Sequence, residues 1–138
     1  SSAASDVYKR QLLDRIDMHI EVPSVEYEAM RRKEKPETSA QVRARVNAAR
    51  ELQKQRFSGT GVSCNAYMTP AMIGQYCLLD AAGERLMKGA FDRLGLTGRS
   101  HDRILRMART IADLDASPDI QAAHLAEAIQ YRSSTLLK

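Results

Sequence analysis

The residues best suited to chemistry in this chain are four arginines at regular spacing. Arg99, Arg103, Arg106 and Arg109 follow one another at intervals of four, three and three residues, so a helix would carry them on roughly one face. A guanidinium keeps its charge at every physiological pH and binds phosphate oxygens well. This face could therefore contact phosphate, a neighbouring subunit or DNA, and a solvated helix surface is the alternative.

A fifth arginine stands in a different setting. Arg15 lies between Asp14 and Asp17, just ahead of the alternating run from Met18 to Val22, which Pro23 stops. This order predicts an arginine-bearing turn followed by a short strand. Arg15 could stabilise charge on a phosphoryl group during its transfer, or it could simply pair with the neighbouring carboxylates.

The predicted strand from Met18 to Val22 needs a sheet, and no later segment is suited to supply one. We therefore expect the chain to begin just before the last strand of a larger domain that it does not contain. Such a strand has unpaired edges. It should be disordered, folded back on the rest of the chain, or paired with another copy.

Cysteines and histidines give no sign of a metal site. Cys64 and Cys77 do not form a CxxC pair, so we predict reduced, structural thiols. His101 and His124 are isolated from other ligand types in the sequence, which favours capping or surface roles. His19 alternates outward from its apolar neighbours, and we assign it no role.

Composition favours helices. Of 138 residues 43% are hydrophobic, but only 5% are aromatic and tryptophan is absent, so the core must use aliphatic side chains and methionine. The net charge of +4 permits a polyanionic partner without requiring one. No apolar run is long enough to cross a bilayer, and no signal peptide is evident. We expect a cytoplasmic protein with no membrane partner.

Five segments combine a helix-start residue with an apolar stripe at helical spacing. They are a helix of about 17 residues capped by Thr38 or Ser39, a short helix over Pro70 to Tyr76, a helix from Asp80 to Gly95, a helix from Thr97 to Ser117, and a helix from Gln121 to Tyr131. The predicted fold class is therefore all-α, a small helical bundle preceded by an orphan strand and a charged linker.

The domain boundaries follow from these elements. Residues 1–11 are small and polar without periodicity, and we expect a disordered or foreign flank. Residues 12–23 would end the larger domain, residues 24–37 would form a charged linker with a short helical turn, and residues 38–138 would form the helical bundle.

Three stretches carry a resemblance to a known family. They run from Leu12 to Asp17, from Gly98 to Leu114 and from His124 to Arg132. In this order and spacing they resemble the C-terminal region of magnesium-chelatase-like AAA+ ATPases, most closely the competence protein ComM group. The likeness covers Leu12 to Arg132 and stops abruptly upstream. The family would carry Ser-Gly-Pro before Leu12, where this chain has Tyr-Lys-Arg-Gln, and this break supports a foreign flank.

The resemblance implies a protein with an N-terminal Lon-protease-like domain, an αβα nucleotide-binding core and a helical C-terminal lid. This chain would hold the end of the core (12–23) and the lid (38–138). The full-length protein would bind ATP and magnesium and assemble with its own copies into a ring, expected to be a hexamer. The GxxxxGK[ST] phosphate loop is absent from the sequence. We therefore predict that the fragment alone binds no cofactor and does not hydrolyse ATP.

The resemblance also implies roles for three arginines. Arg15 would be an arginine finger that reaches the nucleotide of the neighbouring subunit. Arg99 would be the sensor 2 arginine, which reaches from the lid to the γ-phosphate held by its own subunit, and Arg103 is the second candidate. From the residues alone, Arg99 could equally be a solvated side chain, although an arginine at a helix N-terminus opposes the helix dipole.

Three functions therefore remain open. The first is the lid of an ATP-driven ring that processes DNA during transformation or recombination, as the resemblance implies. The alternative is a stand-alone basic helical module that binds DNA, and the third is a protein-interaction domain. Only the first explains why an arginine-bearing turn and an orphan strand precede the bundle.

Overall fold

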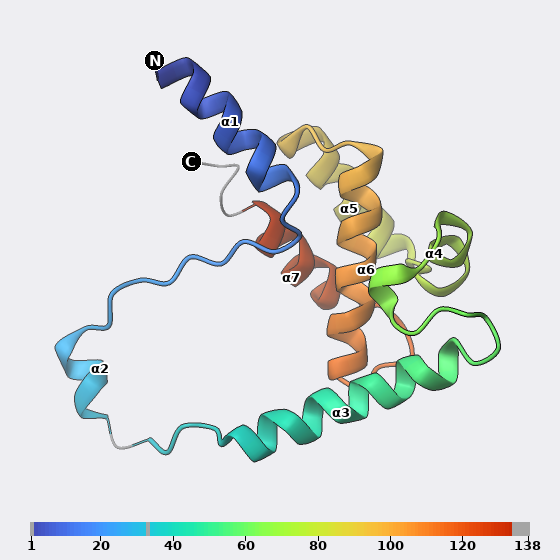
Figure 1. Ribbon diagram of the computed structural model, residues 1–138, viewed down its shortest axis with the longest axis horizontal. Coiled ribbons are helices and arrows are strands. Elements are labelled where there is room, and N and C mark those ends of the chain that lie inside the picture. Colours follow the sequence, from blue (N-terminus) through green and yellow to red (C-terminus); the bar gives the residue numbers. More distant parts are fainter. Residues whose placement is uncertain (1, 33, 134–138) are drawn as a thin grey trace.

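The residues that the computed structural model of the chain describes, 2–32 and 34–133, form helices joined by irregular segments, and none of them lies in a β-strand (Figure 1). The elements are α1 (Ser2–Asp14), α2 (Tyr27–Arg31), α3 (Ser39–Arg56), the 3₁₀ helix η1 (Asn65–Tyr67), α4 (Pro70–Tyr76), α5 (Ala81–Leu94), α6 (Gly98–Leu114) and α7 (Ala122–Ser133). An isolated parallel bridge joins Leu79 to Ile120. The all-α prediction is confirmed.

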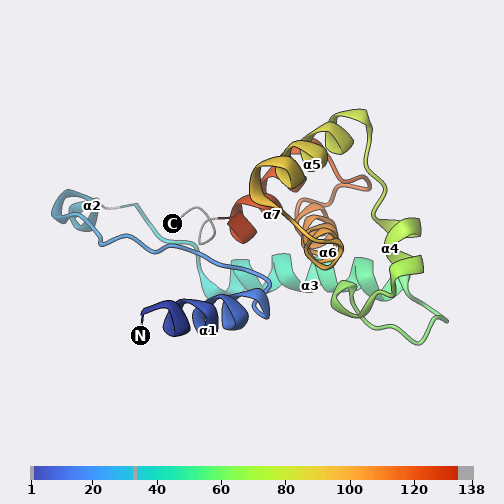
Figure 2. The ribbon, with the colours of Figure 1, turned by 90° about the horizontal axis from the view of Figure 1, so that it is seen from above.

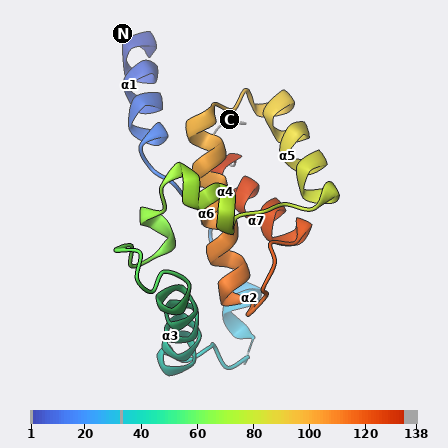
Figure 3. The ribbon, with the colours of Figure 1, turned by 90° about the vertical axis from the view of Figure 1, so that its right-hand side faces the viewer.

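Helix α6 is the central element of the bundle. It packs against α3, η1, α4 and α7, while α5 packs against α7 (Figure 3). Apolar side chains at helical spacing on α6 and α7 meet in the core, which buries Ile104, Leu105, Ala108, Ala112, Leu125, Ala128 and Ile129. Of the stripe predicted for α6, Ile104 and Ala108 are buried, Met107 and Ile111 are partly buried, and Leu114 is 39% exposed. The residues predicted to face inward on α7, Leu125, Ala128 and Ile129, are all buried, because a helix with an apolar face must cover that face with other helices.

Local capping sets the helix boundaries close to the predicted ones. Thr38 and Gln41 form a reciprocal capping box at the start of α3. Side-chain oxygens of Thr69, Asp80 and Thr97 accept backbone N–H bonds at the starts of α4, α5 and α6. Gly95 ends α5 with φ of 60°, a conformation that favours glycine. The caps therefore confirm these boundaries.

Helix α3 is only partly covered. It extends along one edge of the bundle (Figure 1), with Ala49 buried but Val42 and Leu52 each 38% exposed. All three belong to the apolar stripe predicted for this helix. The stripe is therefore real in spacing, but the bundle covers only part of it.

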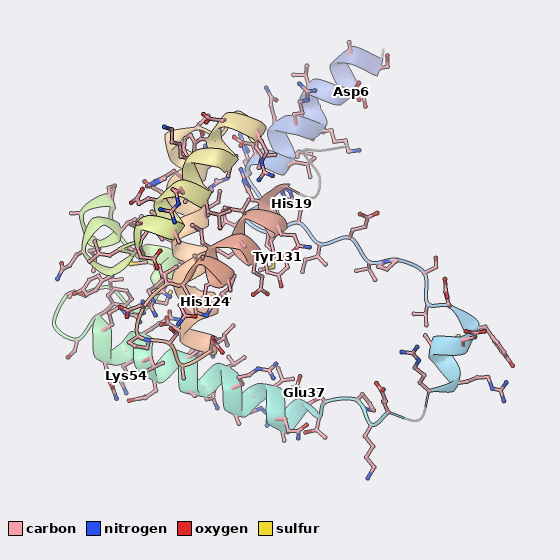
Figure 4. The ribbon with its side chains drawn as sticks, turned by 180° about the vertical axis from the view of Figure 1, so that it is seen from behind. Asp6, His19, Glu37, Lys54, His124 and Tyr131 are labelled. Carbon is pink, nitrogen blue, oxygen red and sulfur yellow. The ribbon has the colours of Figure 1, made fainter. Side chains whose placement is uncertain are left out.

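The predicted strand from Met18 to Val22 is wrong, since these residues are irregular. The segment is folded back on the bundle, one of the three expected arrangements, only at His19, because Ile20 and Val22 are 62% and 84% exposed. The backbone N–H of His19 donates to the Tyr131 carbonyl at 2.7 Å (Figure 4), and the His19 ring lies 3.0 Å from the Leu13 carbonyl. His19 is buried, so its predicted outward position is also wrong.

The flank and the linker lie outside the bundle. The flank was expected to be disordered, but residues 2–14 form α1, so this prediction is wrong. Helix α1 buries none of its side chains. The foreign origin of residues 1–11 stays a prediction. The described residues of the linker are all exposed, with α2 at the place of the expected helical turn. Figure 2 shows this segment running away from the bundle.

Candidate functional site

Arg99 lies in the first turn of α6 and is exposed. The cap at Thr97 accepts the backbone N–H of Ser100 and so fixes where the helix begins. The first backbone N–H groups of a helix point outward and favour anions. Arg99 therefore stands where its guanidinium and a helix N-terminus could approach the same anion.

Arg103, one turn further along α6, is held by another part of the chain. Its side chain is only 12% exposed, and Nε lies 3.1 Å from Oδ1 of Asp17. Its Nη1 donates to the backbone carbonyl of Asp14. The structure therefore places Arg103 against the turn that carries Arg15, and two of its three guanidinium nitrogens bond there.

Arg132, near the end of α7, holds the same turn from a second helix. Its side chain is 4% exposed, and Nη2 lies 3.0 Å from Oδ1 of Asp14, while Nη1 donates to the Ile16 carbonyl. Burial lowers the pKa of Arg132, and the charges of Arg103 and Arg99 lower it further, whereas Asp14 and Asp17 raise it. Arg99, Arg103 and Arg132, here named the arginine cluster, therefore lie close enough to repel one another.

Arg15 itself is exposed in the turn between the residues that the cluster binds. The carbonyls of Asp14 and Ile16, on either side of Arg15, both accept bonds from cluster guanidiniums. The structure thus brings all three predicted site residues to one end of the bundle. Arg132 was missed as a site residue because its role depends on a partner far away in the sequence; its place at the end of the third resembling stretch was the only signal.

Arg106 and Arg109, the other two arginines of the predicted basic face, make contacts inside the bundle. The prediction that Arg109 faces phosphate, a neighbouring subunit, DNA or solvent is wrong. It is 4% exposed, and it bonds Asp113 and the carbonyls of Ser117 and Pro118. Arg106 is half-buried and donates to the Met68 carbonyl at 2.9 Å. Because other helices and loops pack around α6 beyond its first turn, the part of this face that carries Arg106 and Arg109 is covered.

Asp113 gathers the buried charges at the far end of α6. Its carboxylate is fully buried and binds Arg56 at 2.6 Å as well as Arg109 at 3.1 Å. Asn65 donates to the same carboxylate at 2.9 Å. This network ties α3, η1 and the α6–α7 loop to α6, so it supports the bundle on the side away from the arginine cluster.

Cysteines and histidines show no metal chemistry. Cys64 and Cys77 are free thiols, and burial raises the pKa of Cys77 to about 11. Nδ1 of His124 accepts the backbone N–H of Gln121 at the start of α7, which confirms a capping role. Within the described parts of the chain, no three potential ligands gather to hold a metal ion, and no helix there is long and apolar enough to span a membrane.

Comparison with known proteins identifies the family to which the chain belongs. The family described as "Magnesium chelatase, subunit ChlI C-terminal" matches residues 36–132. The chain belongs to this family. It is 39% identical over 126 residues to "Competence protein ComM" of Haemophilus influenzae, covering 91% of this chain and 24% of that protein. It is 38% identical over 122 residues to "Uncharacterized protein YifB" of Escherichia coli, covering 88% and 23%.

The magnesium-chelatase-like, ComM-type C-terminal region is thus established, and with it the C-terminal domain of a magnesium-chelatase-like AAA+ protein. The matched residues 36–132 include Arg99, Arg103 and Arg132 but not Arg15. The chain spans about a quarter of the length of these curated relatives. Activities that need the remaining three quarters therefore belong to the whole protein.

Proposed function

We propose that this chain is the nucleotide-responsive lid of a ring-forming ATPase. The observation that carries the proposal is the exposed Arg99 at the start of α6, at the same end of the bundle as the Arg15 turn. A lid acts by contacting the nucleotide differently in its bound and hydrolysed states, and such a differential contact is enough to shift its position.

Arg99 is the residue proposed to read the nucleotide. It is exposed, whereas Arg103 and Arg132 are occupied by the Asp14–Asp17 turn. A guanidinium at the N-terminus of the central helix would bind the γ-phosphate held by the same subunit and move the bundle as a unit. Arg103, the second candidate for this role, would need to release Asp17 first.

Arg15 is proposed to act in trans, as an arginine finger on the nucleotide of the neighbouring subunit. Stabilising the charge of a transferring phosphoryl group can accelerate hydrolysis by roughly 10³- to 10⁵-fold. Since such a finger must cross a subunit interface, the proposal includes a homo-oligomeric ring, expected to be a hexamer, and a cytoplasmic location.

ATP and magnesium would be held mainly by residues outside this chain. The sequence has no phosphate loop, and the described residues offer no cluster of ligands for a cation. We propose that the chain alone does not hydrolyse ATP and that the whole protein does. The name of the ComM relative points to competence, so the proposed work of the ring is DNA processing during transformation or recombination.

The upstream gene sequence tests the proposal first. A phosphate loop is expected in the reading frame ahead of Leu12. An unrelated domain in its place would reject the proposal that the whole protein is an ATPase. In the full-length protein, Arg99→Ala should lower ATP turnover or the response to nucleotide. Arg93→Ala, at an exposed position near the end of α5, is the matched control and should leave both unchanged.

The finger is tested by mixing subunits. Arg15→Ala should reduce hydrolysis while nucleotide binding persists. When Arg15→Ala subunits that retain their own phosphate loop are mixed with subunits whose phosphate loop is inactivated, turnover should recover, because the inactive subunits lend their Arg15 to the active ones. Wild-type turnover in a ring made only of Arg15→Ala subunits would exclude the finger.

A DNA-binding module is the second candidate, favoured by the exposed side of α3. Arg43, Arg50 and Lys54 are exposed there and spaced to share a face. If this face binds DNA, the isolated chain should bind duplex DNA with an affinity that falls by roughly tenfold or more from 50 to 200 mM salt. Loss of that binding in an Arg50→Ala/Lys54→Ala variant would support this candidate; no binding at 50 mM salt would reject it.

A further inference from the structure

Two arginines from different helices bind one short turn, and this arrangement links the two proposed nucleotide contacts. Arg103 on α6 binds Asp17 and the Asp14 carbonyl. Arg132 on α7 binds the Asp14 carboxylate and the Ile16 carbonyl. The residue between the bound carbonyls is Arg15, which is exposed. The bundle therefore fixes the backbone on both sides of Arg15 and leaves its side chain free to reach outward.

The same helix carries the other proposed contact. Arg99 and Arg103 are four residues apart on α6, so they are neighbours on one helix surface. Helix α7, which carries Arg132, packs directly against α6. A displacement of α6 produced by phosphate binding at Arg99 would therefore also move both side chains that hold the Arg15 turn.

We propose that Arg103 and Arg132 are positioning residues that couple the nucleotide state of one subunit to the placement of Arg15 against the nucleotide of its neighbour. The coupling rests on the function proposed above, because it needs both a lid contact and a finger. It runs from Arg99 through α6 to Arg103 and Arg132, and from them to the turn. Arg103 and Arg132 touch no nucleotide in this scheme.

The burial of Arg132 explains why the turn stays docked. A buried guanidinium is costly unless its donors find acceptors, and the Asp14–Asp17 turn supplies three acceptor atoms to Arg132. The carboxylates of Asp14 and Asp17 are themselves 60% and 66% exposed. The turn therefore lies on the surface of the bundle, where it can be displaced as a unit when the arginines beneath it shift.

The main alternative is that these contacts only stabilise the bundle. The two explanations differ in which subunit shows the defect. A stabilising contact would affect the subunit that carries the variant, whereas a positioning contact would affect hydrolysis by the neighbouring subunit. Mixed rings separate them, because subunits with an inactivated phosphate loop still lend Arg15 but do not hydrolyse ATP themselves.

The experiment measures turnover in full-length rings that mix active Arg15→Ala subunits with donor subunits whose phosphate loop is inactive. Donors carrying Asp14→Asn and Asp17→Asn should lower kcat roughly tenfold or more, as expected for a misplaced catalytic group, with KM for ATP unchanged. Donors carrying Asp92→Asn, an exposed carboxylate on α5, are the control. Unchanged kcat with the Asp14→Asn/Asp17→Asn donors would overturn the coupling, and so would loss of ring assembly by them.

A charge exchange provides the rescue. Donors carrying Arg103→Asp should fail as the carboxylate variants do, and adding Asp17→Arg to them should restore a large part of the turnover. Failure of this rescue in rings that assemble would count against the coupling. Failure of the coupling can be distinguished from failure of the proposed function. A ring with Arg15→Ala in every subunit tests the finger without any change at Arg103 or Asp17.

Discussion

Arg132 and Asp14 are 118 positions apart in the sequence, yet Nη2 of the guanidinium lies 3.0 Å from Oδ1 of the carboxylate. Through this contact the last described helix of the bundle holds the segment that precedes the exposed linker. Arg132 is nearly fully buried and Asp14 is mostly exposed. Substituting Arg132 should therefore have a different effect from substituting Asp14. Removing the arginine leaves a cavity, whereas removing the carboxylate only releases the turn.

The first prediction concerns that release. Asp14→Asn should change the free energy of unfolding of the bundle by no more than about 1 kcal/mol, because Asp14 is 60% exposed and the buried Arg132 keeps its backbone acceptors at Asp14 and Ile16. It should nevertheless loosen the turn, so the backbone N–H of His19, which donates to the Tyr131 carbonyl, should exchange with solvent deuterium faster than in the wild type. Asp119→Asn is the control. Equal exchange rates in wild type and Asp14→Asn would contradict the prediction.

The second prediction concerns the buried carboxylate of Asp113. Asp113→Ala should lower the free energy of unfolding by about 3–5 kcal/mol, because it leaves Arg56 and Arg109 without their shared partner. Chemical denaturation followed by circular dichroism measures the loss. The matched change Asp115→Ala removes a carboxylate that is 68% exposed and that lies 2.8 Å from Nε2 of His124. An Asp113→Ala loss no larger than that of Asp115→Ala would show that the network is not a main source of stability.

The third prediction is a pH dependence. The folded chain keeps the Cys77 thiol protonated up to a pKa of about 11, against 9.0 for an ordinary thiol. The unfolded chain therefore loses this proton first as pH rises, so the stability from this group is complete below pH 9 and is lost between pH 9 and about 11. The loss should be on the order of 2 kcal/mol.

Unfolding at a series of alkaline pH values checks this loss. Cys77→Ala should lower stability at every pH because it leaves a cavity, yet it should flatten the decline above pH 9. Cys64→Ala, which removes the half-buried thiol, should keep the wild-type decline. The same slope in wild type and Cys77→Ala would contradict the assignment.

The fourth prediction uses two glycines of opposite conformation. Gly95→Ala should destabilise the bundle by about 1 kcal/mol, because φ of 60° at this position is strained for a side chain. Gly89→Ala should stabilise it by up to about 1 kcal/mol, because Gly89 lies within α5 and an added Cβ would meet nothing within 4 Å. Thermal unfolding of both variants should give shifts of opposite sign; shifts of the same sign would contradict the role of Gly95 as a helix stop.

The bundle could be predicted from the sequence because its signals are local. Thr38, Thr69, Asp80 and Thr97 cap their helices as their residue types predict. Glycine and proline mark where helices end or begin. The apolar stripes of α6 and α7 need only the period of the helix to be recognised.

What the sequence could not predict depends on partners distant in the chain. The alternation from Met18 to Val22 is typical of a strand, but a strand forms only where another strand supplies its hydrogen bonds. Here the backbone N–H of His19 bonds helix α7 instead. Nor does spacing tell a solvated arginine from a buried one. Arg99 and Arg109 share a helix and a charge, and only the elements that cover α6 decide that one is exposed and the other sealed.

Helix α6 runs for about 21 Å from the exposed Arg99 to the buried Asp113. A stiff helix that is held at its Asp113 end and moved at its Arg99 end turns about the held end. Ion pairs of the buried Asp113 with Arg56 and Arg109 hold that end. A displacement at Arg99 would therefore not be lost through sliding of the helix at Asp113. A displacement of about an ångström at the Arg99 end would therefore move the whole helix together with the elements packed against it.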